Sequence, residues 1–227
     1  DQTIIEKRSD ESPGYGYVLS LRNSNYIYFY SRDNEGNVSL SYSTNPISLN
    51  EYHHIAVVLD RDGLSKIFVD GVEDSSFNIS NITDISNNGK LRIGRGNLTV
   101  EDSIHQVFNG SIDDLKIYDR ALTATEVSAD YNGSHSSTNL VLHLPFDQNQ
   151  FTTDFSNNGN KGYVHGANWT RNGIGSGAYE FDGVDDYIEV QNPSLPEGDV
   201  NKSITVWAKI TEECEFVDCN IGGFGNT

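Results

Sequence analysis

The chain has 227 residues, of which 33 are acidic and 15 basic, so its formal net charge is −18. This charge disfavours nucleic acid as a partner, because phosphate binding needs clustered lysine and arginine side chains. Hydrophobic residues make up 36% of the chain and aromatic residues 11%. That is enough to build a core, and no apolar run reaches the roughly 18 residues of a membrane span.

Alternation of apolar and polar residues predicts strands along most of the chain. We expect them at residues 15–22, 25–32, 53–60, 64–70, 90–94, 111–118, 140–146, 177–181, 186–190 and 203–210, with 221–224 as a further candidate. Asp62-Gly63 and Asp70-Gly71 predict tight turns between strands, because glycine readily adopts the positive φ that such turns require. Many short strands joined by such turns predict an all-β fold.

One short helix is expected after residue 122. Thr123 and Glu126 form a capping box, in which each side chain accepts a hydrogen bond from the backbone of the other residue. The helix should end near Asn132-Gly133. The sequence therefore predicts an antiparallel two-sheet β-sandwich with one short helix, and residues 129–139 resemble a linker.

Cysteines and glycosylation motifs both favour an extracellular location. Cys214 and Cys219, with four residues between them, suit a local disulfide across a turn, with free thiols as the alternative. Eight positions fit Asn-x-Ser/Thr without proline, and each predicts an exposed loop if the chain passes through a glycosylating secretory route. These asparagines are Asn37, Asn78, Asn81, Asn97, Asn109, Asn132, Asn168 and Asn201, and an Asn- and Ser-rich surface could also produce such motifs by chance.

Two groups of motifs resemble a known family. The segments Phe181-Asp-Gly-Val-Asp-Asp-Tyr-Ile-Glu-Val190, Ser203-Ile-Thr-Val-Trp-Ala-Lys209 and Leu140-Val-Leu-His-Leu-Pro-Phe-Asp147 resemble the first half of a laminin G-like (concanavalin A-like, pentraxin-type) domain. His53-His-Ile-Ala-Val-Val58, Ile67-Phe-Val-Asp-Gly-Val72 and the segment 108–122 resemble its second half. Tyr52 departs from the family pattern, which usually has tryptophan there. The resemblance implies a jelly-roll-like sandwich and a non-catalytic domain.

The two halves occur in reversed order. The family's second half lies at residues 1–128 and its first half at 140–227, so the chain is one period of the domain cut inside it. Either the two halves pair within one chain, or each completes a domain with a neighbouring chain. Completion by a neighbour would join copies head to tail into a fibre, because such a contact need not close. We expect completion by a neighbour.

The acidic residues favour calcium over catalysis. In a strand, neighbouring side chains point to opposite faces, so Asp113 and Asp114, or Asp185 and Asp186, should not share one catalytic site. Calcium takes six to eight oxygen ligands. Asp154, Asn157 and Asn160 form an Asx-rich loop that could supply them, and the resemblance implies that Asp113 lies nearby. Such loops also occur as ordinary turns.

Aromatic side chains offer a second candidate site. Tyr26, Tyr28 and Tyr30 share one face of their strand and could stack sugar rings, or could form a cross-strand ladder that holds the sheet. His53 and His54 alternate across a strand and are interpreted as packing residues.

The sequence therefore predicts a non-enzymatic extracellular module, a repeat or subunit of a cell-surface filament or adhesin that assembles with copies of itself. The alternative is a carbohydrate-binding module of a secreted protein or glycoside hydrolase, with a structural calcium ion. The expected partners are copies of the chain and glycans, without nucleic acid.

Overall fold

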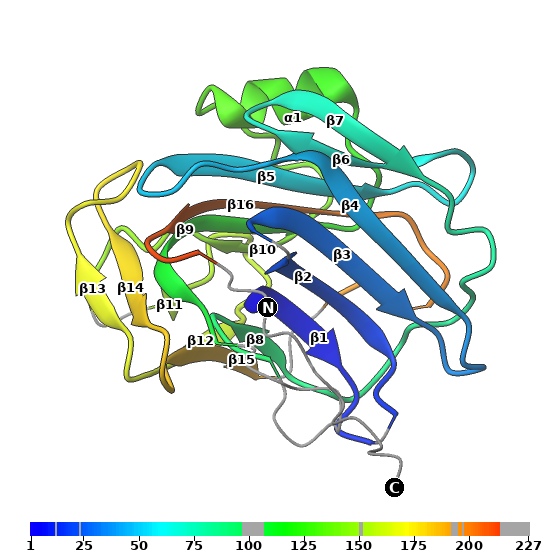
Figure 1. Cartoon of the computed structure of the whole chain (residues 1–227), viewed down its shortest axis with the longest axis horizontal. Coiled ribbons are helices and arrows are strands. Elements are labelled where there is room, and N and C mark those ends of the chain that lie inside the picture. Colours follow the sequence, from blue (N-terminus) through cyan, green and yellow to red (C-terminus); the bar gives the residue numbers. More distant parts are fainter. Residues whose placement is uncertain are drawn as a thin grey trace, which may run out of the picture.

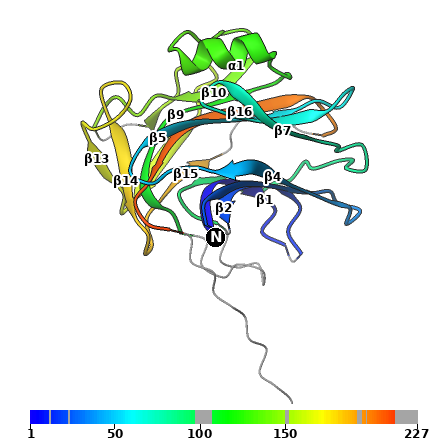
Figure 2. The ribbon, with the colours of Figure 1, turned by 45° about the horizontal axis from the view of Figure 1, so that its top comes forward.

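The computed structural model describes residues 1–11, 13–22, 24–96, 107–149, 152–191, 195–196 and 198–213. These residues form two antiparallel sheets packed face to face, with one helix on the outside of the second sheet (Figure 1, Figure 2). The predicted all-β sandwich with one short helix is thereby confirmed.

The first sheet has eight strands in the described part of the chain. Their order across the sheet is β11 (Thr152–Thr153), β12 (Lys161–His165), β15 (Tyr187–Gln191), β8 (Leu91–Ile93), β1 (Gln2–Arg8), β2 (Gly16–Arg22), β3 (Tyr26–Arg32) and β4 (Val38–Pro46). β4 forms one edge of this sheet.

The second sheet is built the same way. Its strand order is β13 (Asn168–Thr170), β14 (Ala178–Asp182), β9 (Asn109–Tyr118), β16 (Lys202–Ile210), β5 (Tyr52–Leu59), β6 (Ser65–Val69) and β7 (Val72–Phe77), and β10 (Leu140–Leu144) pairs with β9 off this path. The strand candidate at 221–224 lies outside the described residues.

Strand alternation fixes which side chains face the core. In β3, Ile27 and Phe29 are fully buried between the sheets, while the tyrosines on either side of them point outward. In β16 the core-facing residues are Ile204, Val206, Ala208 and Ile210. The hairpin of β6 and β7 turns at Asp70 and Gly71, both with positive φ, as the Asp-Gly motif predicts.

The helix α1 (Ala124–Tyr131) begins at the predicted capping box. The Thr123 hydroxyl accepts a hydrogen bond from the backbone of Glu126, and the Glu126 carboxylate accepts one from the backbone of Thr123. Val127 anchors the helix in a small apolar cluster on the outer face of the second sheet, with Ala56, Val58, Phe68, Tyr118, Leu122 and Leu140. Residues 129–131, placed in the linker by the sequence, belong to this helix because they complete its last turn.

Both halves of the chain pair within one sandwich. β16 lies between β9 and β5, β14 pairs with β9, and β15 pairs with β8. The structure thus has the first of the two expected arrangements, with both halves in one chain, and completion by a neighbouring chain stays a prediction. The physical reason is proximity, because the short segment after α1 brings β10 beside β9 and lets the following strands enter both sheets of their own chain.

Candidate functional site

The tyrosine row lies on the outer face of the first sheet. Tyr28 stands directly opposite Tyr42 of β4, and their ring centroids are 4.8 Å apart. The Arg22 guanidinium lies 4.5 Å from the centroid of the Tyr28 ring, within cation–π distance. Tyr26 and Tyr30, which are half-buried, stand opposite Pro46 and Leu40, with a shift in the register between Tyr26 and Tyr28. We call this surface, made of Tyr26, Tyr28, Tyr30, Leu40 and Tyr42, the tyrosine face.

The three predicted tyrosines do not contribute equally to this surface. Tyr28 is only 6% exposed, because Arg22 and Tyr42 cover it, so it supports the other side chains from below. The accessible apolar area comes from the edge strand β4, where Leu40 is 55% exposed and Tyr42 39%. β4 is not among the strands predicted from the sequence, although alternation in Val38-Ser-Leu-Ser-Tyr-Ser43 could have indicated it.

The predicted calcium loop is organised around Asp154. One carboxylate oxygen of Asp154 accepts hydrogen bonds from the backbone N–H groups of His143 and Ser156, and the other accepts from the Ser156 hydroxyl and from Asn160. Partial burial alone would raise the pKa of Asp154, but these hydrogen bonds outweigh it and lower the pKa. Donors therefore already surround this carboxylate, which ties the loop to β10.

Asp113 lies apart from that loop. It is buried, and it accepts hydrogen bonds from the backbone N–H groups of Asp114 and Ile174. Burial, with the neighbouring Asp114 carboxylate, raises the pKa of Asp113 to about 7. Among the described residues no hydrogen bond or ion pair joins Asp113 to Asp154. Of the predicted ligands Asp154, Asn157, Asn160 and Asp113, the structure brings Asp154 and Asn160 into contact, and calcium binding there stays a prediction.

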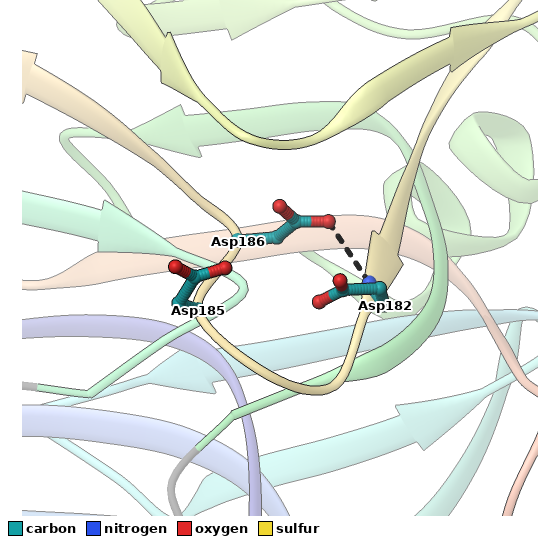
Figure 3. A group of neighbouring side chains, drawn as sticks. All are labelled: Asp182, Asp185 and Asp186. Atoms are coloured by element: carbon teal, nitrogen blue, oxygen red, sulfur yellow. Dashed lines mark hydrogen bonds between the residues drawn. The ribbon is translucent and has the colours of Figure 1, made fainter.

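A different acidic group forms in the turn between β14 and β15. The carboxylates of Asp182, Asp185 and Asp186 offer oxygens that lie within 4.8 Å of one another (Figure 3). The expectation that Asp185 and Asp186 cannot share one site is thus wrong, because Asp185 lies in the turn, where strand alternation does not apply. Two carboxylates already accept backbone hydrogen bonds, Asp186 from Asp182 and Asp182 from Val184. The motif Asp182-Gly-Val-Asp-Asp186 was the signal in the sequence.

A groove on the outer side of the second sheet adjoins this acidic group. Its volume is about 370 Å³, and Asp182, Asp186, Asn109, Asn168 and Lys209 are among its lining residues. The carboxylates and the Lys209 ammonium together give it mixed charge.

The asparagines of the glycosylation motifs that the structure describes fall into three groups. Side chains of Asn37, Asn81 and Asn132 donate hydrogen bonds from their amide nitrogens, to Asp33, Val38 and Ser128 respectively. Asn78 and Asn168 are exposed, and no hydrogen bond from their amide nitrogens to another described residue is present. Asn109 and Asn201 are half-buried and use their side-chain oxygens as acceptors. Asn97, like the cysteine pair Cys214 and Cys219, lies outside the described residues.

His53 and His54 each contact an acidic side chain. His54 is buried beneath α1, where it contacts Asp130 and the ring of Trp207. His53 contacts the carboxylate of Asp70 at 2.8 Å and the hydroxyl of Ser48 at the same distance.

Comparisons with known proteins agree with this architecture. A laminin G-like family model, described as the concanavalin A-like lectin/glucanases superfamily, matches residues 1–128, more than half of the 227 residues. No curated protein and no solved structure matches the chain. No helix in the described part of the chain is both long and apolar enough to cross a membrane. On the family match and the two-sheet topology, the chain belongs to the laminin G-like members of the concanavalin A-like lectin/glucanases superfamily.

Proposed function

We propose that this chain is a non-catalytic extracellular adhesive module that binds glycans on the tyrosine face. Domains of this family are in general non-catalytic and typically extracellular. The observation that carries the proposal is the accessible row of Tyr42 and Leu40 on the edge strand, backed by Tyr28 and Arg22. Aromatic faces stack on the apolar faces of sugar rings, and tyrosine hydroxyls bond sugar hydroxyls.

The tyrosine row can serve both as a cross-strand ladder that holds the sheet and as a surface on which sugar rings stack. Cross-strand contacts such as Tyr28–Tyr42 hold the rings in place before any ligand arrives, which reduces the entropy lost on binding. Each half of the domain has its partner in the same chain, so the module proposed here does not require the head-to-tail filament expected from the sequence, which stays a prediction.

Two of the predicted carboxyl groups are poorly placed to act on a bound sugar. Asp113, the carboxyl group whose pKa is raised to about 7, is 1% exposed and directed at backbone N–H groups, so a substrate has no access to it. The carboxylate of Asp154 is surrounded by hydrogen-bond donors of its own loop. Neither carboxyl group presents a free oxygen to a bound sugar.

Replacing Tyr42 with alanine is expected to weaken glycan binding about 2- to 12-fold, since an aromatic contact contributes about 0.5–1.5 kcal/mol. The measurement is a glycan screen to find a ligand, followed by titration calorimetry. Tyr163→Ala is the matched control, because Tyr163 of β12 is 45% exposed near the opposite edge of the same sheet. Absence of any glycan ligand, or equal losses in the two variants, would reject the proposed site.

Glycans are expected on the chain if it is secreted through a glycosylating route. Asn78 and Asn168 should be occupied most fully, because their amide nitrogens are exposed and carry no hydrogen bond that attachment would disturb. Intact mass spectrometry of native material, compared with Asn78→Gln and Asn168→Gln, should show the loss of one glycan mass each. A mass equal to that of the bare polypeptide would contradict this prediction.

A further inference from the structure

A cavity opens between the two sheets at one end of the sandwich. Its volume is about 300 Å³, and three lysines line it: Lys7 from β1, Lys202 from β16 and Lys90 from the loop before β8. Tyr17 of β2, Asn87 and Pro196 also line this cavity. We call it the end cavity.

Two of these lysines occupy positions that face the core. Lys202 is two residues before Ile204, so strand alternation places it on the face that Ile204 and Val206 present to the core. Lys7 stands opposite Leu91 and Tyr17, which are both core residues. Lys202 is 1% exposed and Lys7 is 9% exposed, so both ammonium groups are held inside the end of the sandwich.

Burial of an ammonium group is costly unless partners satisfy its three N–H donors. Lys7 meets this need, because its ammonium donates to the backbone carbonyl and the side-chain oxygen of Asn87, at 2.7 and 2.9 Å. Lys202 does not. Its hydrogen bond to a described residue is a 3.3 Å contact with the carbonyl of Pro196.

No carboxylate of the described residues lies within ion-pair distance of Lys202. Asp199, one of the nearer acidic groups, is already paired with Arg61 at 2.8 Å. Burial, helped by the positive charge of Arg61, lowers the pKa of Lys202 to about 8. Among the described residues, therefore, no carboxylate pairs with this buried ammonium group in the cavity wall.

The wall of the end cavity is closely packed and supplies a further donor. Asn87 bonds the backbone of Ile85 and Gly89, and a Cβ atom at Gly89 would lie 1.7 Å from the carbonyl oxygen of Arg8, so this loop packs directly on the strand end. Burial raises the pKa of Tyr17, which keeps its hydroxyl protonated as a donor. Preformed donors of this kind suit an acceptor with several oxygens.

We propose that the end cavity binds a small oxyanion, a carboxylate, sulfate or phosphate group, which pairs with the ammonium group of Lys202 between the two sheets. Such a group offers two to four acceptor oxygens to the donors of Lys202 and Tyr17. The net charge of −18 gives the molecule as a whole no attraction for anions, so binding must come from this local arrangement. The site is separate from the tyrosine face and does not depend on the proposed glycan binding.

The test is a titration of the full chain with sodium sulfate, sodium phosphate, glucuronate and a sugar sulfate, each at constant ionic strength against chloride. Binding is followed by calorimetry and by the amide NMR signals of Asn87 and Gly89. Melting temperature alone is not a suitable readout, because sulfate stabilises proteins by exclusion from their surface. The sugar acids and the inorganic ions together show whether the oxyanion is recognised alone or as part of a sugar.

Lys202→Met removes the ammonium and keeps the length of the side chain. We expect saturable binding by wild type and at least a roughly tenfold loss of affinity in this variant, since a charge-assisted hydrogen bond contributes that much. Lys66→Met is the matched control, because Lys66 of β6 is paired with Glu73 of β7 and neither residue lines the end cavity. It should bind like wild type.

The opposite results would overturn the proposal. Wild type that shows no saturable shift at Asn87 or Gly89 with any of the four anions binds no oxyanion in the end cavity. Equal affinity in wild type and Lys202→Met would place the anion elsewhere. If Lys202→Met does not fold, the wild-type NMR titration decides by itself, because the shifts must centre on the cavity wall.

Discussion

Replacing Asp130 with asparagine is expected to lower the free energy of unfolding by about 1–3 kcal/mol, because it removes one of the two carboxylates that pair with the buried Lys116 ammonium and leaves Asp114 as the other. Asp130 of α1 and Lys116 of β9 are 2.9 Å apart, and their side chains are 2% and 1% exposed. The other oxygen of Asp130 lies 3.3 Å from Nε2 of His54. The pair clamps the helix to the second sheet, so urea denaturation of the variant should show the loss directly.

The control is an ion pair of the same kind on the surface. Lys66 and Glu73 are 2.8 Å apart but 36% and 43% exposed, so Glu73→Gln should cost at most about 1 kcal/mol. Adding Lys116→Met to Asp130→Asn should recover part of the loss, because an apolar side chain of similar volume needs no counter-charge. Equal costs for Asp130→Asn and Glu73→Gln would contradict the clamp.

The same pair makes a defined contribution to acid stability. Burial alone would raise the pKa of Asp130, but His54 and Lys116 outweigh it and hold the pKa well below the usual range. A carboxyl group with a lowered pKa in the folded state stabilises the fold above its unfolded pKa of about 3.9, and this contribution is lost as the pH falls below that value. The stability of Asp130→Asn should therefore decline less steeply than that of wild type between about pH 5 and pH 2.

Cutting the chain in the exposed turn after α1, between residues 134 and 135, is expected to give two fragments that do not fold alone. β16 fills the gap between β9 and β5, so without it the apolar residues of both neighbours face water. Val57, Leu59 and Val206 are all buried, and each contributes about 1.5–3 kcal/mol. Together, the burial of several such residues contributes more free energy than the total stability of a typical domain, which is about 5–15 kcal/mol.

The two fragments should recover the fold when mixed, as a one-to-one complex. Circular dichroism and size-exclusion chromatography of each fragment and of the mixture measure this. Val206→Asp in the second fragment should abolish the complex, whereas Val200→Asp, at a position that is 38% exposed, should leave it intact. A cooperatively folded monomer formed by either fragment alone would show that the sandwich does not need both halves.

Features encoded by neighbouring residues could be predicted from the sequence. The alternation in Tyr26-Ile-Tyr-Phe-Tyr30 places the aromatic row on one face, the Asp70-Gly71 pair sets the hairpin turn, and Thr123 with Glu126 starts the helix. Each signal is complete within a few residues, because strand alternation, turn geometry and capping are local. β1 escaped prediction because its second half, Glu6-Lys-Arg8, is charged, although the fold buries it.

The tertiary structure alone decided which residues from distant parts of the chain meet. Whether the halves pair within one chain depends on which strands reach each other first, and the sequence of a short polar linker permits both outcomes. Asp130 meets Lys116, and Lys202 joins Lys7 at the end of the sandwich, only through the order of strands in the two sheets. In the sequence each of these lysines is an ordinary charged residue; burial, which only the packed sheets create, gives it an ion-pair or anion-binding role.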